Sequence, residues 1–356
     1  MTKRIVLAYS GGLQSSAAIT WLTERHQAEV VTLSLDVGQA ADLVSAHDRA
    51  LAAGAVRSHV VDAREAFAQD IVVPVLKAGA LSDARYPMST GMGRPVMASQ
   101  LVDIARIEDA TIVAHGGVGR DRWRLDNLLR SLNPDLTVVA CAAEHGMAAS
   151  QLQEYVERHQ GRSWPAGDSR GRADDNLWGR TTGRRGDDAA QEVPDMVFTR
   201  TRPLARCPDE PAFVEVGFDR GVPVCINGVK MSIVELVASL SIIAGEHGVG
   251  RLDRVKCGPD GTRSRVVYEA PGAVALHAAH LELARFVSPG ALHAFSRTVS
   301  TVYAGLIGTG EWFSSLRRAL DAFVDRANEP ATGTVRLRLF KAACTVAGRT
   351  LEPRNL

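Results

Sequence analysis

The first half of the chain alternates short apolar segments with segments of helical spacing, and this order constrains the fold more than any other feature. The apolar segments are continuous, as in "RIVLAYS" (4–10) and "EVVTLSLDVG" (29–38). Between them, "SSAAITWLTER" (15–25) carries apolar residues at helical intervals. Strands that are apolar throughout are buried on both faces, and strand–helix–strand order makes them parallel. The pattern therefore predicts an α/β fold built on a parallel sheet that helices cover on both faces.

The second half has a different pattern. Residues 160–195 are rich in Gly, Arg and Asp and lack periodicity, so we expect a long linker or functional loop there. An α+β unit follows, and we place the domain boundary so that the domains are 1–165 and 166–356. The other expected elements are a helix over 40–55 closed by Gly54, strands over 58–64 and 111–117, a hairpin over 213–227, a helix over 232–250, helices from about 275 to 323 broken near "SPG" and "GTGEW", and a hairpin over 333–350.

Composition excludes several classes of protein. The 356 residues are 46 % hydrophobic and 23 % charged, which is ordinary for a globular protein. The net charge of +1 argues against a nucleic-acid-binding protein, which needs a concentrated basic surface. No apolar run is long enough for a membrane span and the N-terminus lacks the pattern of a signal peptide, so we expect a cytoplasmic protein. The five cysteines include no CxxC pair, so we expect neither a disulfide framework nor a metal site.

The segment "AYSGGLQSS" (8–16) lies where a predicted strand meets a predicted helix. Its two glycines let the backbone approach phosphate oxygens closely, and the N–H groups at a helix start bind anions. The segment matches neither the GxxxxGK[ST] nor the GxGxxG motif. On these residues alone, an ordinary Gly-Gly turn with a serine N-cap remains the alternative.

Matches along the rest of the chain favour the phosphate-binding interpretation. "AYSGGLQSS" resembles the "AYSGGLDTS" loop of the argininosuccinate synthase family, within the ATP-pyrophosphatase superfamily. The resemblance covers nearly the whole chain. It implies a nucleotide-binding domain of the adenine nucleotide alpha hydrolase type, then an α+β synthetase and multimerisation domain with a shortened C-terminal tail. Further matches follow in family order: "DVGQ" (36–39), "RYPMSTGMGRP" (85–95), "AHGG" (114–117), "NPDL" (133–136), "DNLWGR" (175–180), "GVPVCING" (221–228), "HGVGRLD" (247–253), "SRVVYEAPG" (264–272) and "LRRALDAFVD" (316–325).

The resemblance implies a reaction and its cofactors. Enzymes of this family use ATP, with Mg²⁺, to adenylate the ureido oxygen of citrulline and release pyrophosphate, and the amine of aspartate then displaces AMP. Gln14 stands where the family has an aspartate, so it offers a neutral oxygen where a carboxylate would hold Mg²⁺ more strongly. His115 in "AHGG" is expected to pack at the strand end and not to act as a base. The implied ATP contacts are Ala8, Tyr9, Ser10, Gly11, Gly12, Gln14, Ser15, Ser16, Arg94 and Gly116.

The amino-acid sites depart further from the family. The segment "GRDRWRLD" (119–126) is two residues shorter than its family counterpart and lacks the asparagine that contacts both substrates. Val118 replaces a threonine and loses its hydroxyl, and Lys256 replaces a glutamate, which reverses a charge. The implied catalytic residues are Asp121 and Arg124. The implied substrate-binding residues are Tyr86, Thr90, Gly91 (for serine), Val118, Asp121, Arg124, Arg172 (for serine), Thr181 (for serine), Lys256 and Tyr268.

Four functions remain open at this point. We expect an ATP-dependent C–N ligase, in a specialised biosynthetic pathway, whose acceptor is not citrulline, because two added positive charges favour a more anionic acceptor. The first alternative is a genuine argininosuccinate synthase in which Lys256 and Arg172 lie on solvated loops. The second is a nucleotide-binding pseudoenzyme, while a tRNA-modifying relative ranks last because the charge is balanced. The expected partners are small molecules, an amino-acid-like acceptor and an amine donor, and further copies of the chain as a dimer or tetramer.

Overall fold

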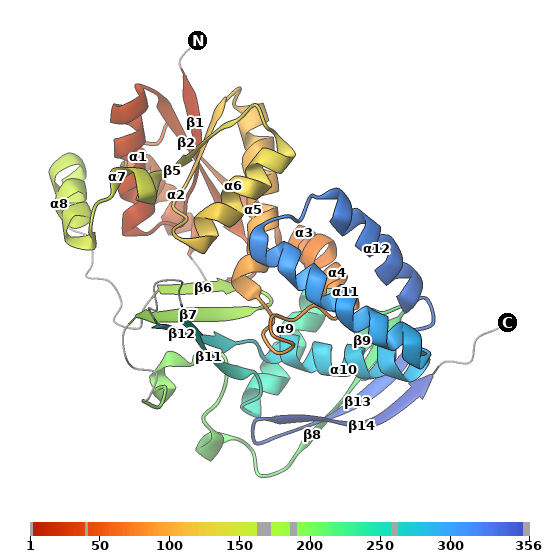
Figure 1. Cartoon of the computed structure of the whole chain (residues 1–356). Helices are drawn as coiled ribbons and strands as arrows, with labels where there is room; N and C mark the ends of the chain where they lie inside the picture. Colours follow the sequence, from red (N-terminus) through yellow and green to blue (C-terminus); the bar gives the residue numbers. More distant parts are fainter. Residues whose placement is uncertain (1–2, 40–41, 162–171, 186–190, 258–262, 352–356) are drawn as a thin grey trace. The chain divides into compact units, whose positions relative to one another are not determined.

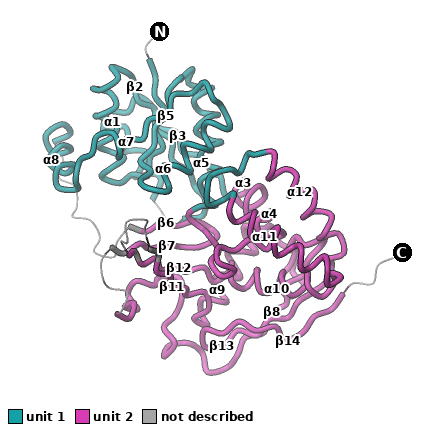
Figure 2. Tube along the Cα trace, viewed as in Figure 1, with its two compact units in different colours: residues 1–64, 91–167, 306–314 teal, residues 65–90, 168–305, 315–356 magenta. Residues whose placement is uncertain are grey.

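The computed structural model describes residues 3–39, 42–161, 172–185, 191–257 and 263–351 (Figure 1). The side chains at positions 172, 184, 185, 256, 257 and 264 are also outside the description. The chain forms two compact units, drawn in Figure 2: unit 1 comprises residues 1–64, 91–167 and 306–314, and unit 2 comprises 65–90, 168–305 and 315–356. The predicted boundary after residue 165 lies outside the described residues. A division of the chain at that one position would not reproduce the two units, because segment 65–90 belongs to unit 2 and segment 306–314 belongs to unit 1.

Unit 1 is built on a five-stranded parallel sheet with the order β3-β2-β1-β4-β5. The chain moves from β1 outward to β3 and then resumes on the other side of β1. Because crossovers between parallel strands are right-handed, this reversal puts the later helices on the opposite face, and Figure 1 shows α1 and α5 on opposite sides of the sheet. The strands are β1 (Arg4–Ala8), β2 (Glu29–Asp36), β3 (Arg57–Asp62), β4 (Ile112–His115) and β5 (Thr137–Ala140); the helices are α1 (Leu13–His26), α2 (Leu43–Ala52), α5 (Ser89–Ile107), α6 (Arg120–Leu132), α7 (Cys141–His145) and α8 (Ala149–Gln160).

A core of small and branched apolar side chains joins this sheet to α1 and α2. Ile5 and Leu7 of β1 pack with Ile19 and Leu22 of α1, and all four are fully buried. The small side chain of Ala46 lets α2 approach the same cluster. Burying side chains of this size contributes about 1.5–3 kcal/mol each. This packing fixes the junction between β1 and α1, where the predicted phosphate-binding segment lies.

Unit 2 contains two antiparallel sheets, with the orders β10-β9-β8-β13-β14 and β11-β12-β7-β6. Within the described residues, no helix is long and apolar enough to cross a membrane. The strands are β6 (Arg172–Asn176), β7 (Gly179–Arg185), β8 (Ala212–Asp219), β9 (Val222–Ile226), β10 (Val229–Lys230), β11 (Arg251–Cys257), β12 (Arg263–Glu269), β13 (Gly333–Phe340) and β14 (Ala343–Leu351); the helices are α3 (Arg64–Phe67), a π-helical turn (Ala68–Val72), α4 (Val73–Lys77), α9 (Ile233–Glu246), α10 (Pro271–Val287), α11 (Gly290–Thr309) and α12 (Ser315–Asn328).

Most predicted elements are confirmed, and one is wrong. The strands and helices of the first half, both hairpins and the breaks between α10, α11 and α12 lie as expected. The prediction of a loop over 160–195 is wrong for 172–185, which forms β6 and β7. These strands are polar, and β7 is held in the sheet by its ladder with β12. Apolar alternation therefore could not reveal them, and residues 162–171 and 186–190 lie outside the described residues.

Candidate active site

The segment 8–16 lies at the point where the order of the parallel sheet reverses. It follows β1, and its neighbour β4 ends at His115, just before Gly116. In open α/β sheets, ligands bind outside the carboxyl ends of the strands at such a reversal, because the two connections diverge and leave a crevice. The topology therefore brings Gly11, Gly12 and Gly116 to the same edge of unit 1.

Hydrogen bonds between hydroxyl groups and one glycine with a positive φ define the shape of this segment. The Tyr9 and Ser16 hydroxyls are hydrogen-bonded at 2.8 Å, and the Ser10 and Ser15 hydroxyls at 3.3 Å. Gly11 has φ +74°, in the left-handed region, and a Cβ there would lie 2.6 Å from Nη2 of Arg49. The positive φ favours glycine at this position, and any other residue would also have to displace the end of the Arg49 side chain. Ser10 is exposed.

The start of α1 is suited to an anion. Gly12 is the N-cap residue and has no side chain to accept a hydrogen bond from the first turn. The N-terminus of a helix carries partial positive charge, which a phosphate oxygen can balance. No acidic residue lies in the first turn of α1, where Gln14 is partly buried and neutral. The absence of a carboxylate keeps this turn favourable for phosphate.

Polar contacts around β4 hold the second connection in place. The Nε2–H of the buried His115 donates to Asp126 (2.9 Å), and its Nδ1 accepts from the Gly117 N–H (3.1 Å). Burial alone would raise the pKa of Asp126, but the hydrogen bond and charge of His115, together with the charges of Arg122 and Arg130, outweigh it and hold the pKa below its usual value. Both ring nitrogens of His115 are thus engaged in shaping the turn, which fits the expected packing role.

Asp121 lies between two arginine side chains of unit 1. Nε of Arg94 lies 2.9 Å and 3.1 Å from the two carboxylate oxygens, and Nη1 of Arg124 donates to one of them at 2.7 Å. Burial would raise the pKa of Asp121, but the two guanidinium groups lower it further than burial raises it. Asp121 is therefore ionised at neutral pH. Arg94, which the resemblance assigns to the nucleotide, contacts this carboxylate in the structure.

Arg124 is anchored by the segment of α11 that belongs to unit 1. Its Nε donates to the Ile307 carbonyl (3.0 Å) and its Nη2 to the Gly308 carbonyl (3.3 Å). A Cβ at Gly91 would lie 3.1 Å from Cγ2 of Ile307 and 3.6 Å from Cζ of Arg124. The absence of a side chain at position 91 thus lets this arginine pack closely. Val118, 43 % exposed, contributes no polar group nearby.

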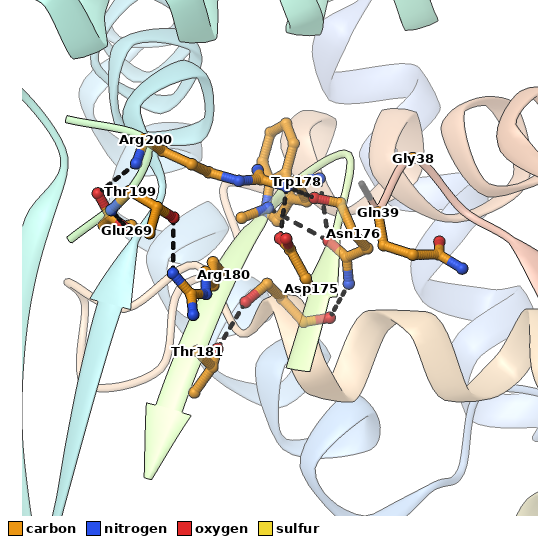
Figure 3. A network of polar contacts seen from close by, with 12 residues as sticks. Gly38, Gln39, Asp175, Asn176, Trp178, Arg180, Thr181, Thr199, Arg200 and Glu269 are labelled. Atoms are coloured by element: carbon orange, nitrogen blue, oxygen red, sulfur yellow. Dashed lines mark hydrogen bonds and ion pairs between the residues drawn. The ribbon is translucent and has the colours of Figure 1, made fainter. Parts of the chain in front are cut away.

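In unit 2, the segment before α5 is fixed by the turn between β6 and β7, shown in Figure 3. Nδ2 of Asn176 donates to the Ser89 carbonyl (2.8 Å), and Nε1 of the buried Trp178 donates to the Pro87 carbonyl (3.1 Å). The Ser89 hydroxyl is hydrogen-bonded to that of Thr181 at 2.8 Å. Thr90, the next residue, is partly buried in the first turn of α5.

The buried carboxylate of Glu269 fixes the neighbouring segment 199–201. Glu269, labelled in Figure 3 with Thr199 and Arg200, accepts hydrogen bonds from the Thr199 N–H (2.8 Å) and the Arg200 N–H (2.7 Å). It also accepts one from the Thr201 hydroxyl (2.7 Å). Arg200 in turn forms an ion pair with Asp175 and donates to the Asn176 carbonyl. Three donors satisfy the carboxylate, as burial of a charge requires.

The two tyrosines expected at the acceptor lie together in unit 2. The rings of Tyr86 and Tyr268 have centroids 5.5 Å apart, and both residues are buried. The Tyr86 hydroxyl donates to the Asp253 carbonyl at 3.0 Å, and the guanidinium of Arg254 lies 4.8 Å from the centre of the Tyr86 ring. Burial raises the pKa of Tyr268, against an opposing hydrogen bond from Arg254. The Tyr268 hydroxyl is thus neutral at physiological pH.

The predicted site residues therefore form two groups, one within each unit. Arg172 lies in β6 and Lys256 in β11, but their side chains are outside the described residues. Sequence reasoning missed Arg254, Asn176 and Trp178. For the last two a signal existed, because they stand inside the "DNLWGR" match; for Arg254 there was none. The unit 1 group is Ala8, Tyr9, Ser10, Gly11, Gly12, Gln14, Ser15, Ser16, Gly91, Arg94, Gly116, Val118, Asp121 and Arg124; the unit 2 group is Tyr86, Thr90, Arg172, Thr181, Lys256 and Tyr268.

Comparison with known proteins shows that both halves of the chain match models of the same protein family. Residues 4–161 match the family model "Arginosuccinate synthase N-terminal HUP domain", and residues 172–354 match "Arginosuccinate synthase C-terminal domain". The argininosuccinate synthase of Symbiobacterium thermophilum is 43 % identical over 98 % of this chain and 88 % of its own length. The chain belongs to the argininosuccinate synthase family. It is an enzyme, an ATP-dependent ligase that forms a C–N bond with release of AMP and pyrophosphate.

Other members of the argininosuccinate synthase family match nearly as well. The argininosuccinate synthase of Rubrobacter xylanophilus is 43 % identical over 99 % of this chain and 87 % of its own, and that of Pyrococcus furiosus is 38 % identical over 97 % and 84 %. A crystal structure of NAD+ synthetase from Burkholderia pseudomallei covers 46 % of this chain and 69 % of its own with a TM-score of 0.32 and 21 % identity, a likeness too low to argue from. The fold class expected from sequence is confirmed: a parallel-sheet nucleotide-binding unit with a second, α+β unit.

Proposed function

We propose that this enzyme is an argininosuccinate synthase, which joins citrulline to aspartate at the expense of ATP. The observation that carries the proposal is the 43 % identity, over 98 % of the chain, to a protein named argininosuccinate synthase. Such a match over both units favours citrulline over the different acceptor that the sequence led us to expect. The geometry supports it through Asp121 and Arg124 in unit 1 and the paired tyrosines in unit 2.

ATP would enter as its magnesium complex, a substrate. In the part of the chain that the structure describes, no group of three or more His, Cys, Asp or Glu side chains is placed to hold a metal ion. The phosphate oxygens would therefore supply most of the magnesium ligands, as is usual for this ion. The proposed nucleotide contacts, all in the first domain as predicted from sequence (residues 1–165), are Ala8, Tyr9, Ser10, Gly11, Gly12, Gln14, Ser15, Ser16, Arg94 and Gly116.

The reaction requires two displacements. The ureido oxygen attacks the α-phosphorus, and the bond to pyrophosphate breaks. The aspartate nitrogen then attacks the ureido carbon, its proton is released, and AMP leaves. A carboxylate with a lowered pKa is a weak base at neutral pH, so we propose that Asp121 orients the substrate ammonium group and is not the proton acceptor. Arg124, fixed by two carbonyls, would donate to the acceptor.

The remaining proposed substrate contacts come from residues 86–91, from Val118 after β4, and from residues 166–356. They are Tyr86, Thr90, Gly91, Val118, Arg172, Thr181, Lys256 and Tyr268. We also propose that the enzyme works as a dimer or tetramer of identical chains, which light scattering during size-exclusion chromatography would determine.

A second candidate function has one specific observation in its favour. Gly91 lies against Arg124 and offers no hydroxyl where the family resemblance expects a serine that contacts citrulline. A site that lacks such a donor binds the usual substrate less well, because polar groups of the ligand are left unpaired. This favours a ligase of the same chemistry with an acceptor other than citrulline.

The test is pyrophosphate release from magnesium ATP with a panel of acceptors and amines, with products identified by mass spectrometry. Release with citrulline and aspartate alone, giving argininosuccinate, is the expected result. Release only with another acceptor would replace the proposal with the second candidate. No release with any pair, while ATP binding is measured separately, would refute both and leave a non-catalytic nucleotide-binding protein. The matched control is Asp121→Asn, which keeps the shape and removes the charge.

A further inference from the structure

One arginine that no part of the family resemblance assigns lies against the paired tyrosines. Arg254 projects from β11, and Nη1 of its guanidinium donates to the Ser82 hydroxyl at 3.0 Å. The same group forms an ion pair with Asp83 and lies within hydrogen-bonding reach of the Tyr268 hydroxyl. Its side chain is only 19 % exposed. A guanidinium presents its N–H donors in a rigid planar arrangement that matches the two oxygens of a carboxylate. A largely buried guanidinium is therefore well suited to bind a carboxylate.

The charged side chains around the Tyr86–Tyr268 pair carry a net positive charge. The guanidinium of Arg254 lies 4.8 Å, and that of Arg85 5.8 Å, from the centre of the Tyr86 ring. The Asp253 carboxylate is neutralised by Arg265, whose Nε lies 3.0 Å from both oxygens. Asp83 is the remaining acid among these described residues, so the group carries a net positive charge and attracts an anion.

The ion pair with Arg254 holds the Asp83 carboxylate only weakly. Its side chain is 60 % exposed, and exposed ion pairs contribute little to stability. Its backbone has φ +52°, and the next residue, Ala84, has φ +53°, a conformation that costs free energy for residues other than glycine. A ligand carboxylate could take the place of the Asp83 carboxylate on Arg254 at small cost.

We propose that Arg254 binds the carboxylate of the amino-acid-like acceptor and helps to determine its specificity, and that Asp83 occupies the guanidinium when the acceptor is absent. The inference rests on the proposed function only in taking the tyrosine pair as part of the acceptor site. It adds the chemical group that is recognised there, a carboxylate, and the residue that recognises it.

A competing role makes the opposite prediction for one variant. If Arg254 only fastens the strained segment Ser82–Tyr86, then Asp83→Asn and Arg254→Gln both loosen it and both weaken acceptor binding. If Arg254 binds the carboxylate, Asp83→Asn removes a competitor, and acceptor binding becomes stronger. The sign of the Asp83→Asn effect therefore separates the two roles.

The experiment measures binding by calorimetry to the full chain with magnesium ATP absent. The probes are matched pairs of an amino acid and its α-carboxamide, namely citrulline, ornithine, N-acetylornithine and glutamate. For at least one pair, Arg254→Gln should weaken binding of the acid by about tenfold or more and leave the amide nearly unchanged. Arg254→Lys should restore part of the loss, and Asp83→Asn should tighten binding of the acid severalfold.

The control variant removes another arginine of β11. Arg251 donates to the Thr201 hydroxyl (2.9 Å) and pairs with Asp195 (2.7 Å), so Arg251→Gln should leave the preference for the acid intact. The proposal is overturned if no pair shows carboxylate-dependent binding, or if Asp83→Asn and Arg254→Gln weaken acid and amide equally. Absence of pyrophosphate release with citrulline and aspartate, alongside carboxylate-dependent binding, would refute the proposed function and retain this inference.

Discussion

Two histidines of α10 make unit 2 sensitive to acid. His277 and His280 are fully buried, which lowers the pKa of His277 to about 3 and that of His280 to about 4. Neither ring nitrogen of His277 has a hydrogen-bond partner among the described residues. Its ring instead contacts the edge of Trp178, with centroids 5.6 Å apart. His280 differs, because Nε2 bonds to Oδ1 of Asn328 at 2.9 Å. Both imidazoles are therefore neutral in the folded protein at neutral pH.

The magnitude follows from linkage between protonation and folding. Each imidazole takes up a proton more readily in the unfolded chain, where its pKa is about 6.5, so unfolding is favoured as pH falls below that value. The contribution of the two neutral histidines to the free energy of unfolding is fully present above about pH 6.5. It declines as the pH falls towards the pKa of each histidine in the folded state. Between about pH 7.5 and 5.5 each histidine should cost about 1.4 kcal/mol of the free energy of unfolding. The pair costs about 3 kcal/mol, a large part of a typical total.

His277→Leu is the decisive variant. Leucine has a similar volume and removes two unpaired buried nitrogens, so the variant should be at least as stable as the wild type at about pH 7.5. Urea unfolding should show that its loss on acidification to about pH 5.5 is smaller than that of the wild type by about 1.4 kcal/mol. Equal losses in the two proteins would refute the reasoning, because they would mean that His277 does not change its pKa on folding.

Three further variants test the site and its supports. Gly11→Ala should weaken ATP binding by about five- to thirtyfold in a calorimetric titration, because φ +74° disfavours a Cβ by about 1–2 kcal/mol; unchanged affinity would contradict the role of this turn. Asp121→Asn should lower the free energy of unfolding by about 1–3 kcal/mol at neutral pH. Since its pKa is lowered in the folded state, the difference should begin to shrink as pH falls below about 4 and disappear as pH falls through the folded pKa, and a constant difference would argue against the ion pairs with Arg94 and Arg124. Gly179→Ala would place a Cβ 2.9 Å from the Glu269 carbonyl and should lower the melting temperature by several degrees; an unchanged value would show that the turn adapts.

The nucleotide-binding unit was predictable because its signals are local. β1 is apolar throughout, and the glycines that follow it stand where the chain must turn, so strand, turn and helix each have a sequence signal. β6 and β7 carry no such signal. Arg180 and Thr181 are polar residues whose strand conformation depends on pairing with β12, almost ninety positions away. That pairing is a tertiary preference, which overrides local propensity.

The candidate site divides in the same way. Asp121 and Arg124 are three positions apart on one helix, so their ion pair is expected from helical spacing. Their contacts to Arg94 and to the Ile307 carbonyl depend on how other segments pack. Arg254 could not be recognised at all, because its role follows from the strained segment at Asp83, which no periodicity predicts.

The make-up of unit 1 has a consequence for the order in which the chain folds during synthesis. Residues 306–314 belong to this unit, where the Thr309 carbonyl accepts from Asn127 (2.9 Å) and Gly310 lies so close to the Arg124 carbonyl that a Cβ there would be 2.4 Å from its oxygen. The first unit to leave the ribosome therefore lacks one of its segments until almost the whole chain has been made. A fragment that ends near residue 165 would emerge with Arg124 detached from its carbonyl anchors, and the ribosome presents that same fragment during every round of translation.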